Sequence, residues 1–107
     1  MRSFRDMYTI VMFDIETKNN QKEITKFKKL LQILGFDMFQ YSIYYKHSTT
    51  KEIALSLEQS LIKDLPHLGK IAILSITSAQ FCRMKIFYDK EKEVVSPQPL
   101  NQNFLII

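Results

Sequence analysis

Hydrophobic positions change their period along the chain, and these changes predict strands separated by helices. Residues 7–15 are β-branched, aromatic and apolar on both faces until Asp14, which is typical of a central strand that ends at an acid. Polar residues 16–21 predict a loop. Asn20, with Glu23 three positions later, fits a capping box at the start of a helix.

Two segments have the helical period. In the first, one face of the predicted helix carries Ile24, Phe27, Leu30, Leu31 and Leu34. Gly35 stands where a glycine would end that helix. In the second segment, Ile53, Leu57 and Leu61 recur every four residues, with Ala54 and Leu65 beside them. Thr49 and Glu52 suggest a capping box at its start, and the helix should stop before Pro66 and Gly69.

The remaining apolar segments have the composition of strands. Residues 36–46 form either one long strand or two short strands with a bend. Residues 70–76 predict a third strand, 77–83 a short turn or helix, and 84–88 a fourth strand. The chain given ends in the apolar residues 104–107, which we expect to dock on a surface as an extra strand.

This order predicts an α+β domain in which two main helices cover one face of an antiparallel sheet. We expect one domain over residues 1–107, with a core at about 7–88 and a C-terminal extension over 89–107. Residues 7–13 and 71–76 are apolar on both faces, so the second face of the sheet needs a cover. Another copy of the chain would provide it, which predicts a homodimer.

Composition narrows the function classes. The formal net charge is +4 and the pI about 9.2, which modestly favours a polyanionic partner. The single cysteine, Cys82, cannot form an internal disulfide. Residues 1–6 lack the apolar core of a signal peptide, and no apolar run is long enough to span a bilayer. We therefore expect a cytoplasmic protein without a membrane partner.

Asp14 is the candidate for metal chemistry. A carboxylate at the end of an apolar strand is costly to desolvate unless it is paired or binds a cation. Mg²⁺ takes one or two carboxylates and keeps several waters, and a symmetric dimer would bring two copies of Asp14 together. The alternative is a solvated or capping acid. Glu16 shares a face with Asp14 at strand spacing, and we favour simple solvation for it.

Two groups of residues are candidates for nucleic-acid binding. Lys18, Lys22, Lys26 and Lys29 could contact phosphates, or could form an ordinary solvated helix face. Tyr41, Tyr44 and Tyr45 with Lys46 could stack on bases, although such clusters are more often core or interface. The sequence offers no zinc-ligand spacing, no G-x-S-x-G serine and no glycine-rich phosphate loop.

Four stretches carry a resemblance to a known family: IVMFDI at 10–15, FKKLLQILGFDMFQYSIYYK at 27–46, ILSIT at 73–77 and SAQFCRM at 78–84. Together they resemble the small CRISPR-associated Cas2 family, the partner of the spacer integrase. The QF and RM after the third strand look like the variant found beside type II systems.

The resemblance implies a ferredoxin-like, two-layer sandwich that dimerises through its open sheet face and extends a C-terminal strand to a partner. It implies a place between two integrase dimers, holding a short DNA duplex. It also implies a magnesium-dependent endonuclease with Asp14 as the catalytic metal ligand. The chain departs from the pattern at Met38 and Phe39, where many members carry basic residues, so one source of transition-state stabilisation is missing.

Three functions therefore compete. The first is a Mg²⁺-dependent phosphodiesterase at Asp14, with duplex DNA or single-stranded RNA as its nucleic acid. The second is a non-catalytic scaffold that binds duplex DNA and the integrase through its lysines. The third is a ferredoxin-like RNA-binding or regulatory module, whose RNA-binding form requires a strand motif that KIAILSIT at 70–77 does not match.

Overall fold

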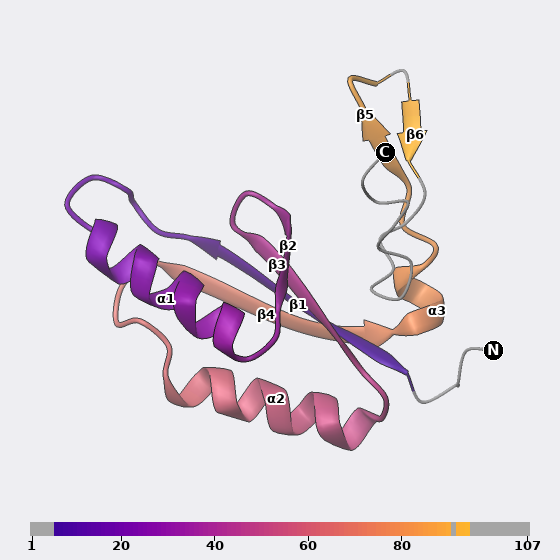
Figure 1. The fold of residues 1–107 in the computed structure, drawn as a ribbon, viewed down its shortest axis with the longest axis horizontal. Coiled ribbons are helices and arrows are strands. Elements are labelled where there is room, and N and C mark those ends of the chain that lie inside the picture. The colour runs from indigo at the N-terminus through magenta and orange to yellow at the C-terminus, as the bar shows by residue number, and fades with distance from the viewer. Residues whose placement is uncertain (1–5, 91, 95–107) are drawn as a thin grey trace.

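The computed structural model describes residues 6–90 and 92–94. Its elements follow in the order β1 (Met7–Asp14), α1 (Gln21–Ile33), β2 (Asp37–Gln40), β3 (Ile43–Ser48), α2 (Lys51–Lys63), β4 (Lys70–Thr77), α3 (Ser78–Phe81), β5 (Ile86–Tyr88) and β6 (Lys92–Val94). The order from β1 to β5 follows the hydrophobic pattern, with residues 36–46 forming two strands, whereas the pattern did not predict β6 (Figure 1).

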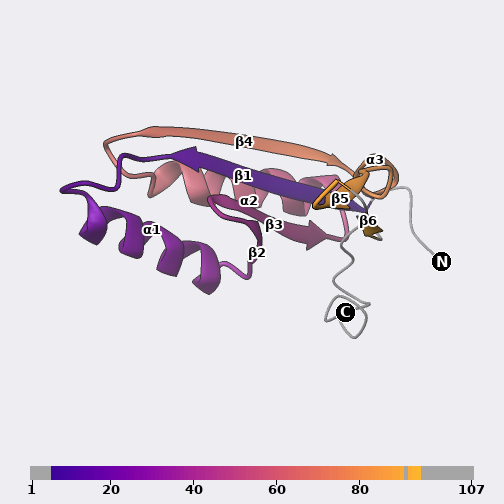
Figure 2. The same cartoon turned by 90° about the horizontal axis from the view of Figure 1, so that it is seen from above.

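Strands β1 to β4 form one antiparallel sheet in the order β2-β3-β1-β4, so the two strands in the middle are β3 and β1 (Figure 2). Helices α1 and α2 lie on the same side of this sheet, with α1 at the left and α2 below the strands in Figure 1. The α+β prediction is therefore confirmed, and the arrangement is that of a ferredoxin-like two-layer sandwich.

The main core lies between the sheet and the two helices. On β1, Val11 and Phe13 point to the helices, while Met12 and Asp14 point to the other face because side chains alternate along a strand. The rest of this core includes Ile15, Ile24, Phe27, Leu31, Phe36, Tyr44, Leu57 and Leu61. The predicted apolar face of α1 is thus the buried one, and on α2 the prediction holds for Ala54, Leu57 and Leu61 but is wrong for Ile53, which is exposed near the start of the helix.

Three hydrogen-bonded polar side chains connect β1, β4 and α2. Thr9 is fully buried, and its Oγ1 lies 2.8 Å from Oγ of Ser75 on β4. The Ser75 hydroxyl in turn donates to Oε2 of Glu58 on α2. Hydrogen bonding of this kind offsets the cost of burying polar groups and fixes α2 against the two strands.

The face of the sheet away from α1 and α2 is only partly covered. Phe81 of α3 stacks on Tyr8 of β1 with ring centroids 3.9 Å apart, and Tyr45 packs against both rings. The neighbouring side chains of Met12 and Leu74 stay exposed. We call this surface the open face.

Residues 36–46 belong to the four-stranded sheet, whereas the strand within 84–88 lies outside it. The first segment forms two strands, β2 and β3, joined by a turn at Ser42, whose φ is 67°. These two strands complete the four-stranded sheet with β1 and β4. The strand predicted at 84–88 is shorter, and it pairs with β6 in a separate hairpin because α3 turns the chain after β4.

The helix starts show two errors in the expected caps. Asn20 precedes α1, but its side-chain amide donates to the carbonyl of Glu16 at 2.9 Å, so the predicted capping box with Glu23 does not form. Helix α2 is capped by Thr50, one residue later than predicted, because its Oγ1 accepts from the Ile53 amide at 3.1 Å. Thr77 and Gln80 form a complete capping box for α3.

Two further expectations concern the last residues of the sequence and membrane-spanning helices. The predicted docking of residues 104–107 as an extra C-terminal strand lies outside the described residues. Over residues 6–90 and 92–94, no helix combines the length and apolarity that a membrane span requires.

Candidate functional site

Asp14 lies at the last position of β1, exposed on the open face of the sheet. It stands directly opposite Lys70, the first residue of β4, so the two side chains share this face. Neither side chain lies within 4 Å of an oppositely charged group in the described part of the chain, where the one contact of this kind is that of His47 Nε2 with Oδ2 of Asp6, at 3.5 Å. The carboxylate is therefore free to bind a ligand.

A shallow cavity of about 380 Å³ opens beside Asp14. The turn between β2 and β3 forms one wall, and the amide of Phe13 fixes this turn by donating to the carbonyl of Ser42 at 3.0 Å. The cavity is lined by Met12, Phe13, Asp14, Tyr41, Ser42, Ile43, Lys70 and Ala72.

The chemistry of these residues suits a weakly held hard cation. Asp14 offers one oxygen ligand, and Mg²⁺ commonly binds through one or two carboxylates and several waters. Within residues 6–90 no group of three or more His, Cys, Asp and Glu side chains could hold a metal, so Glu16 does not join Asp14 in such a cluster. One protomer supplies a partial site, and magnesium at Asp14 stays a prediction.

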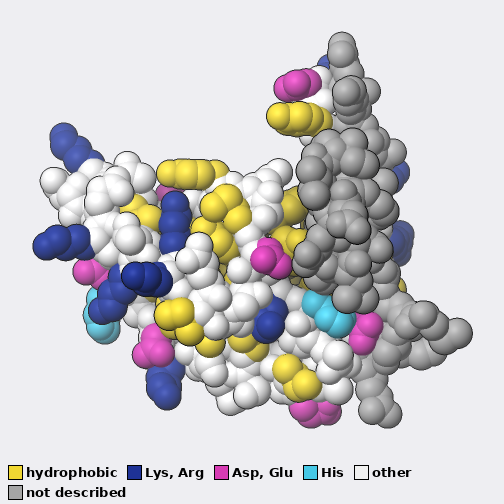
Figure 3. All heavy atoms as spheres, viewed as in Figure 1, with side chains coloured by type: hydrophobic (Ala, Val, Ile, Leu, Met, Phe, Trp, Pro, Cys, Tyr) yellow, Lys and Arg dark blue, Asp and Glu magenta, His cyan; other side chains and the backbone are white. Residues whose placement is uncertain are grey.

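Three of the four lysines of α1 form an exposed row. Lys22, Lys26 and Lys29 lie on the outer face of the helix, opposite the buried face, and Lys18 is exposed in the preceding loop. Lys and Arg side chains gather over α1 at the left of Figure 3. We call Lys22, Lys26 and Lys29 the lysine row.

Lys46 lies apart from the lysine row. It is half-buried on β3, and a Cβ built on Gly35 would lie 2.8 Å from its Nζ, so its side chain passes the C-terminal end of α1. Lys22 lies at the opposite, N-terminal end of this helix. A cation at a helix C-terminus interacts favourably with the helix dipole, which gives Lys46 a structural role beside the predicted one.

The three tyrosines separate into core and surface. Tyr44 and Tyr45 are buried, and burial raises the pKa of both phenols, with the nearby Tyr41 adding to the shift at Tyr44 and Asp37 at Tyr45. Tyr41 is 75% exposed, and the Lys28 ammonium lies 4.8 Å from its ring centroid. Of the predicted stacking cluster, Tyr41 alone presents its ring.

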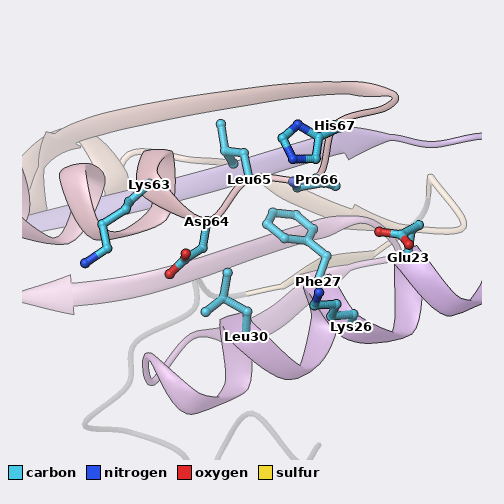
Figure 4. A pocket seen from close by; sticks show the side chains of 9 residues that line it. All are labelled: Glu23, Lys26, Phe27, Leu30, Lys63, Asp64, Leu65, Pro66 and His67. Carbon is cyan, nitrogen blue, oxygen red and sulfur yellow. The ribbon is translucent and has the colours of Figure 1, made fainter.

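A second cavity, of about 350 Å³, lies between α1 and the segment that follows α2 (Figure 4). Phe27 and Leu30 of α1 face Leu65 and Pro66 across it, and charged side chains of both signs surround these apolar residues. No sequence pattern indicated this cavity, because its two walls are far apart in the chain. Lys70 likewise carries no signal in the sequence, because only the strand register places it beside Asp14.

Comparison with known proteins identifies relatives over most of the chain. Residues 7–84 match the model of the family described as CRISPR associated protein Cas2. A protein of Flavobacterium psychrophilum is 36% identical over 104 residues, which cover 95% of this chain and 90% of the relative. A protein of Parvibaculum lavamentivorans is 33% identical over 95 residues, covering 87% and 94%. A Streptococcus mutans protein is 34% identical over 89 residues, covering 81% of each.

All three relatives carry the name CRISPR-associated endoribonuclease Cas2. The family match spans the four-stranded sheet, all three helices and Asp14. Its extent agrees with the motifs at 10–15, 27–46 and 73–84 that first carried the resemblance. This chain belongs to the CRISPR-associated Cas2 family.

Proposed function

We propose that this protein is a homodimeric, magnesium-dependent nuclease of CRISPR spacer acquisition that also holds duplex DNA beside the integrase. One observation carries the proposal: Asp14 projects from the open face of the sheet, next to apolar side chains that a second copy would cover. The names of the relatives, which are endoribonucleases, support single-stranded RNA as the cleaved substrate.

The open face has the character of an interface between copies. Its groove of about 210 Å³ has an apolar lining formed by Ile10, Met12, Phe39, Ile43, Tyr45, Leu74, Phe81 and Met84. Removing apolar surface from water contributes roughly 25 cal/mol per Å². In a twofold-symmetric dimer the same face of both copies forms the interface. Such an arrangement would place the two Asp14 carboxylates near one another.

The chain's own residues would then complete a site that one protomer lacks. Two Asp14 carboxylates repel each other, and a shared cation relieves this repulsion. Magnesium supplies Lewis-acid polarisation of the scissile phosphate when it is bound. Asp14 would hold that ion, and Met38 and Phe39 contribute no guanidinium, so we expect slow cleavage.

The dimer is tested by charging the open face. Leu74, which is 49% exposed on β4, should lie within the interface, so Leu74→Asp should yield a folded monomer. Ile62→Asp is the matched control, because Ile62 is 58% exposed on α2, away from that face. Light scattering behind a sizing column reports the mass. A wild-type monomer at tens of micromolar, or equal dissociation of both variants, would contradict the proposed interface.

Cleavage is tested at Asp14. Asp14→Asn keeps the side-chain size but removes the charge, so magnesium-dependent cleavage of a single-stranded RNA should disappear while the dimer persists. Preparations must be free of contaminating nuclease, which a second purification with an unrelated tag can show. Undiminished cleavage by the variant would remove Asp14 from the mechanism.

A second function, that of a non-catalytic scaffold, is favoured by the lysine row. Helix α1 carries four lysines and one acid, Glu23, so its outer face is a basic surface. In this case Asp14→Asn should leave spacer integration nearly unchanged, whereas replacing the lysine row should impair it. Family membership supports the integrase as partner and the cytoplasm as the place of action. Truncation before Phe104 should weaken either the dimer or its association with the integrase.

A further inference from the structure

We propose that Asp14, Lys70 and Tyr41 form a subsite for one unpaired nucleotide, in which Lys70 binds the phosphate and the ring of Tyr41 stacks on the base. The inference deepens the proposed function and rests on it in one respect, the role of Asp14 in binding the ion at that phosphate. The parts played by Lys70 and Tyr41 follow from the strand register and the cavity beside it.

Lys70 has the position and the freedom that a phosphate ligand needs. It pairs with Asp14 across the β1–β4 ladder, so the two Cβ atoms lie about 5 Å apart on one face. Its ammonium forms no ion pair with Asp14 or with any other carboxylate of the described residues. The ammonium is therefore available to a phosphate, and the Asp14 carboxylate beside it would be available to a cation. The small side chain of Ala72, next on this face of β4, leaves room for the ligand.

Tyr41 completes the cavity on the opposite wall. The hydrogen bond from the Phe13 amide to the Ser42 carbonyl fixes the turn that carries Tyr41 directly beside the end of β1. The Lys28 ammonium lies 4.8 Å from its ring centroid and restrains the ring from the α1 side. The ring is mostly exposed beside a cavity, which makes it a suitable platform for a nucleobase.

The size and geometry of this cavity select an unpaired nucleotide. Its volume, about 380 Å³, lies in the range of pockets that bind small ligands. The bases of a duplex are stacked on one another and cannot reach Tyr41 without being unpaired. Duplex DNA therefore does not need this subsite and is bound through the lysine row, whereas single strands depend on the subsite.

The experiment measures binding without cleavage. Fluorescence anisotropy follows a short labelled single-stranded oligonucleotide on the full chain in EDTA, at several salt concentrations. Lys70→Gln should weaken binding by roughly three- to tenfold and reduce the slope of log affinity against log salt by about 0.7, the value for one phosphate contact on a single strand. Lys51→Gln is the control, because Lys51 is an exposed lysine at the start of α2, near the opposite end of β1 from Asp14.

Tyr41 is tested with a fluorescent base. The emission of 2-aminopurine in the oligonucleotide should fall on binding to the wild type and to Tyr41→Phe, but not on binding to Tyr41→Leu, which keeps an apolar side chain without a ring. Duplex affinity should be unchanged in the Lys70 and Tyr41 variants. Equal losses for Lys70→Gln and Lys51→Gln, or unaltered quenching with Tyr41→Leu, would overturn the subsite.

A magnesium titration separates this inference from the proposed catalysis. Removing the positive charge of Lys70 should tighten magnesium binding roughly threefold, since two cations no longer repel across the ladder, while oligonucleotide binding weakens. Loss of both affinities together would mean that Lys70→Gln disrupts the fold, and would contradict a direct phosphate contact. If Asp14→Asn still cleaves RNA but Lys70→Gln binds it poorly, the subsite stands and the catalytic role of Asp14 fails.

Discussion

The lysine row gives the most quantitative prediction. Lys22 and Lys29 are seven residues apart on α1, which corresponds to about 10 Å along the helix axis. A duplex advances about 3.4 Å per phosphate on each strand, so this length matches about three phosphates. Replacing Lys22, Lys26 and Lys29 by Gln should therefore remove up to three phosphate contacts per protomer.

The expected change follows from counterion release. Each contact contributes about −0.9 to the slope of log affinity against log salt, so the triple variant should lose about 2.7 from this slope. Between 50 and 200 mM salt, a fourfold range, the wild type should lose about 40-fold more affinity for duplex DNA than the variant. Anisotropy of a labelled duplex, titrated at each salt concentration, measures both quantities.

A second triple variant controls for net charge. Lys51, Lys85 and Lys90 are exposed outside α1, so replacing them by Gln removes the same charge from other surfaces. This control should keep nearly the wild-type slope. If both variants lose the same slope, the protein attracts DNA through its overall charge and the lysine row makes no specific contact. If neither loses any, the row is simply a solvated helix face.

Three further predictions concern stability. Thr50→Ala should cost about 1 kcal/mol in urea unfolding because it removes the α2 cap, whereas Thr49→Ala should cost almost nothing, and equal costs would contradict the observed cap. Leu61→Ala should cost about 3–5 kcal/mol, since Leu61 is fully buried between α2 and the sheet, and a loss below 1 kcal/mol would mean that the site collapses. Burial and the nearby Asp37 raise the pKa of the Tyr45 phenol above its usual 10.0, so the folded state favours the protonated phenol. The stability that the protonated phenol contributes is present below pH 10.0 and is lost as the pH rises through the folded-state pKa. Unfolding measured against pH should show a shallower decline in Tyr45→Phe, and an unchanged decline would assign it to other groups.

Local patterns in the sequence determined much of this protein. The buried face of α1 and most of that of α2 follow from the hydrophobic period, because each helix must turn its apolar side to the core, and the position of β1 follows from its continuous apolar, β-branched composition. Gly35 marked the end of α1, and its φ of 91° explains why a glycine stands there. Asp14 stood out for a similar reason, as a carboxylate directly after a buried apolar strand.

Only the tertiary structure decided which residues meet. The caps depended on competing hydrogen bonds: Asn20 had the right spacing from Glu23, yet its amide bonds to Glu16 instead. Tyr41 and Tyr44 look alike in the sequence, but the turn at Ser42 exposes the first and the strand buries the second.

Strand register was the largest gap between sequence and structure. Asp14 and Lys70 are far apart in the chain, and no periodicity within either segment indicates that they share a face. Because a shift of one residue reverses every side chain of a strand, their meeting depends on how β1 and β4 align over their whole length. The sequence by itself determined the elements and one acidic candidate, and the pairing of the strands placed a lysine and a tyrosine beside it.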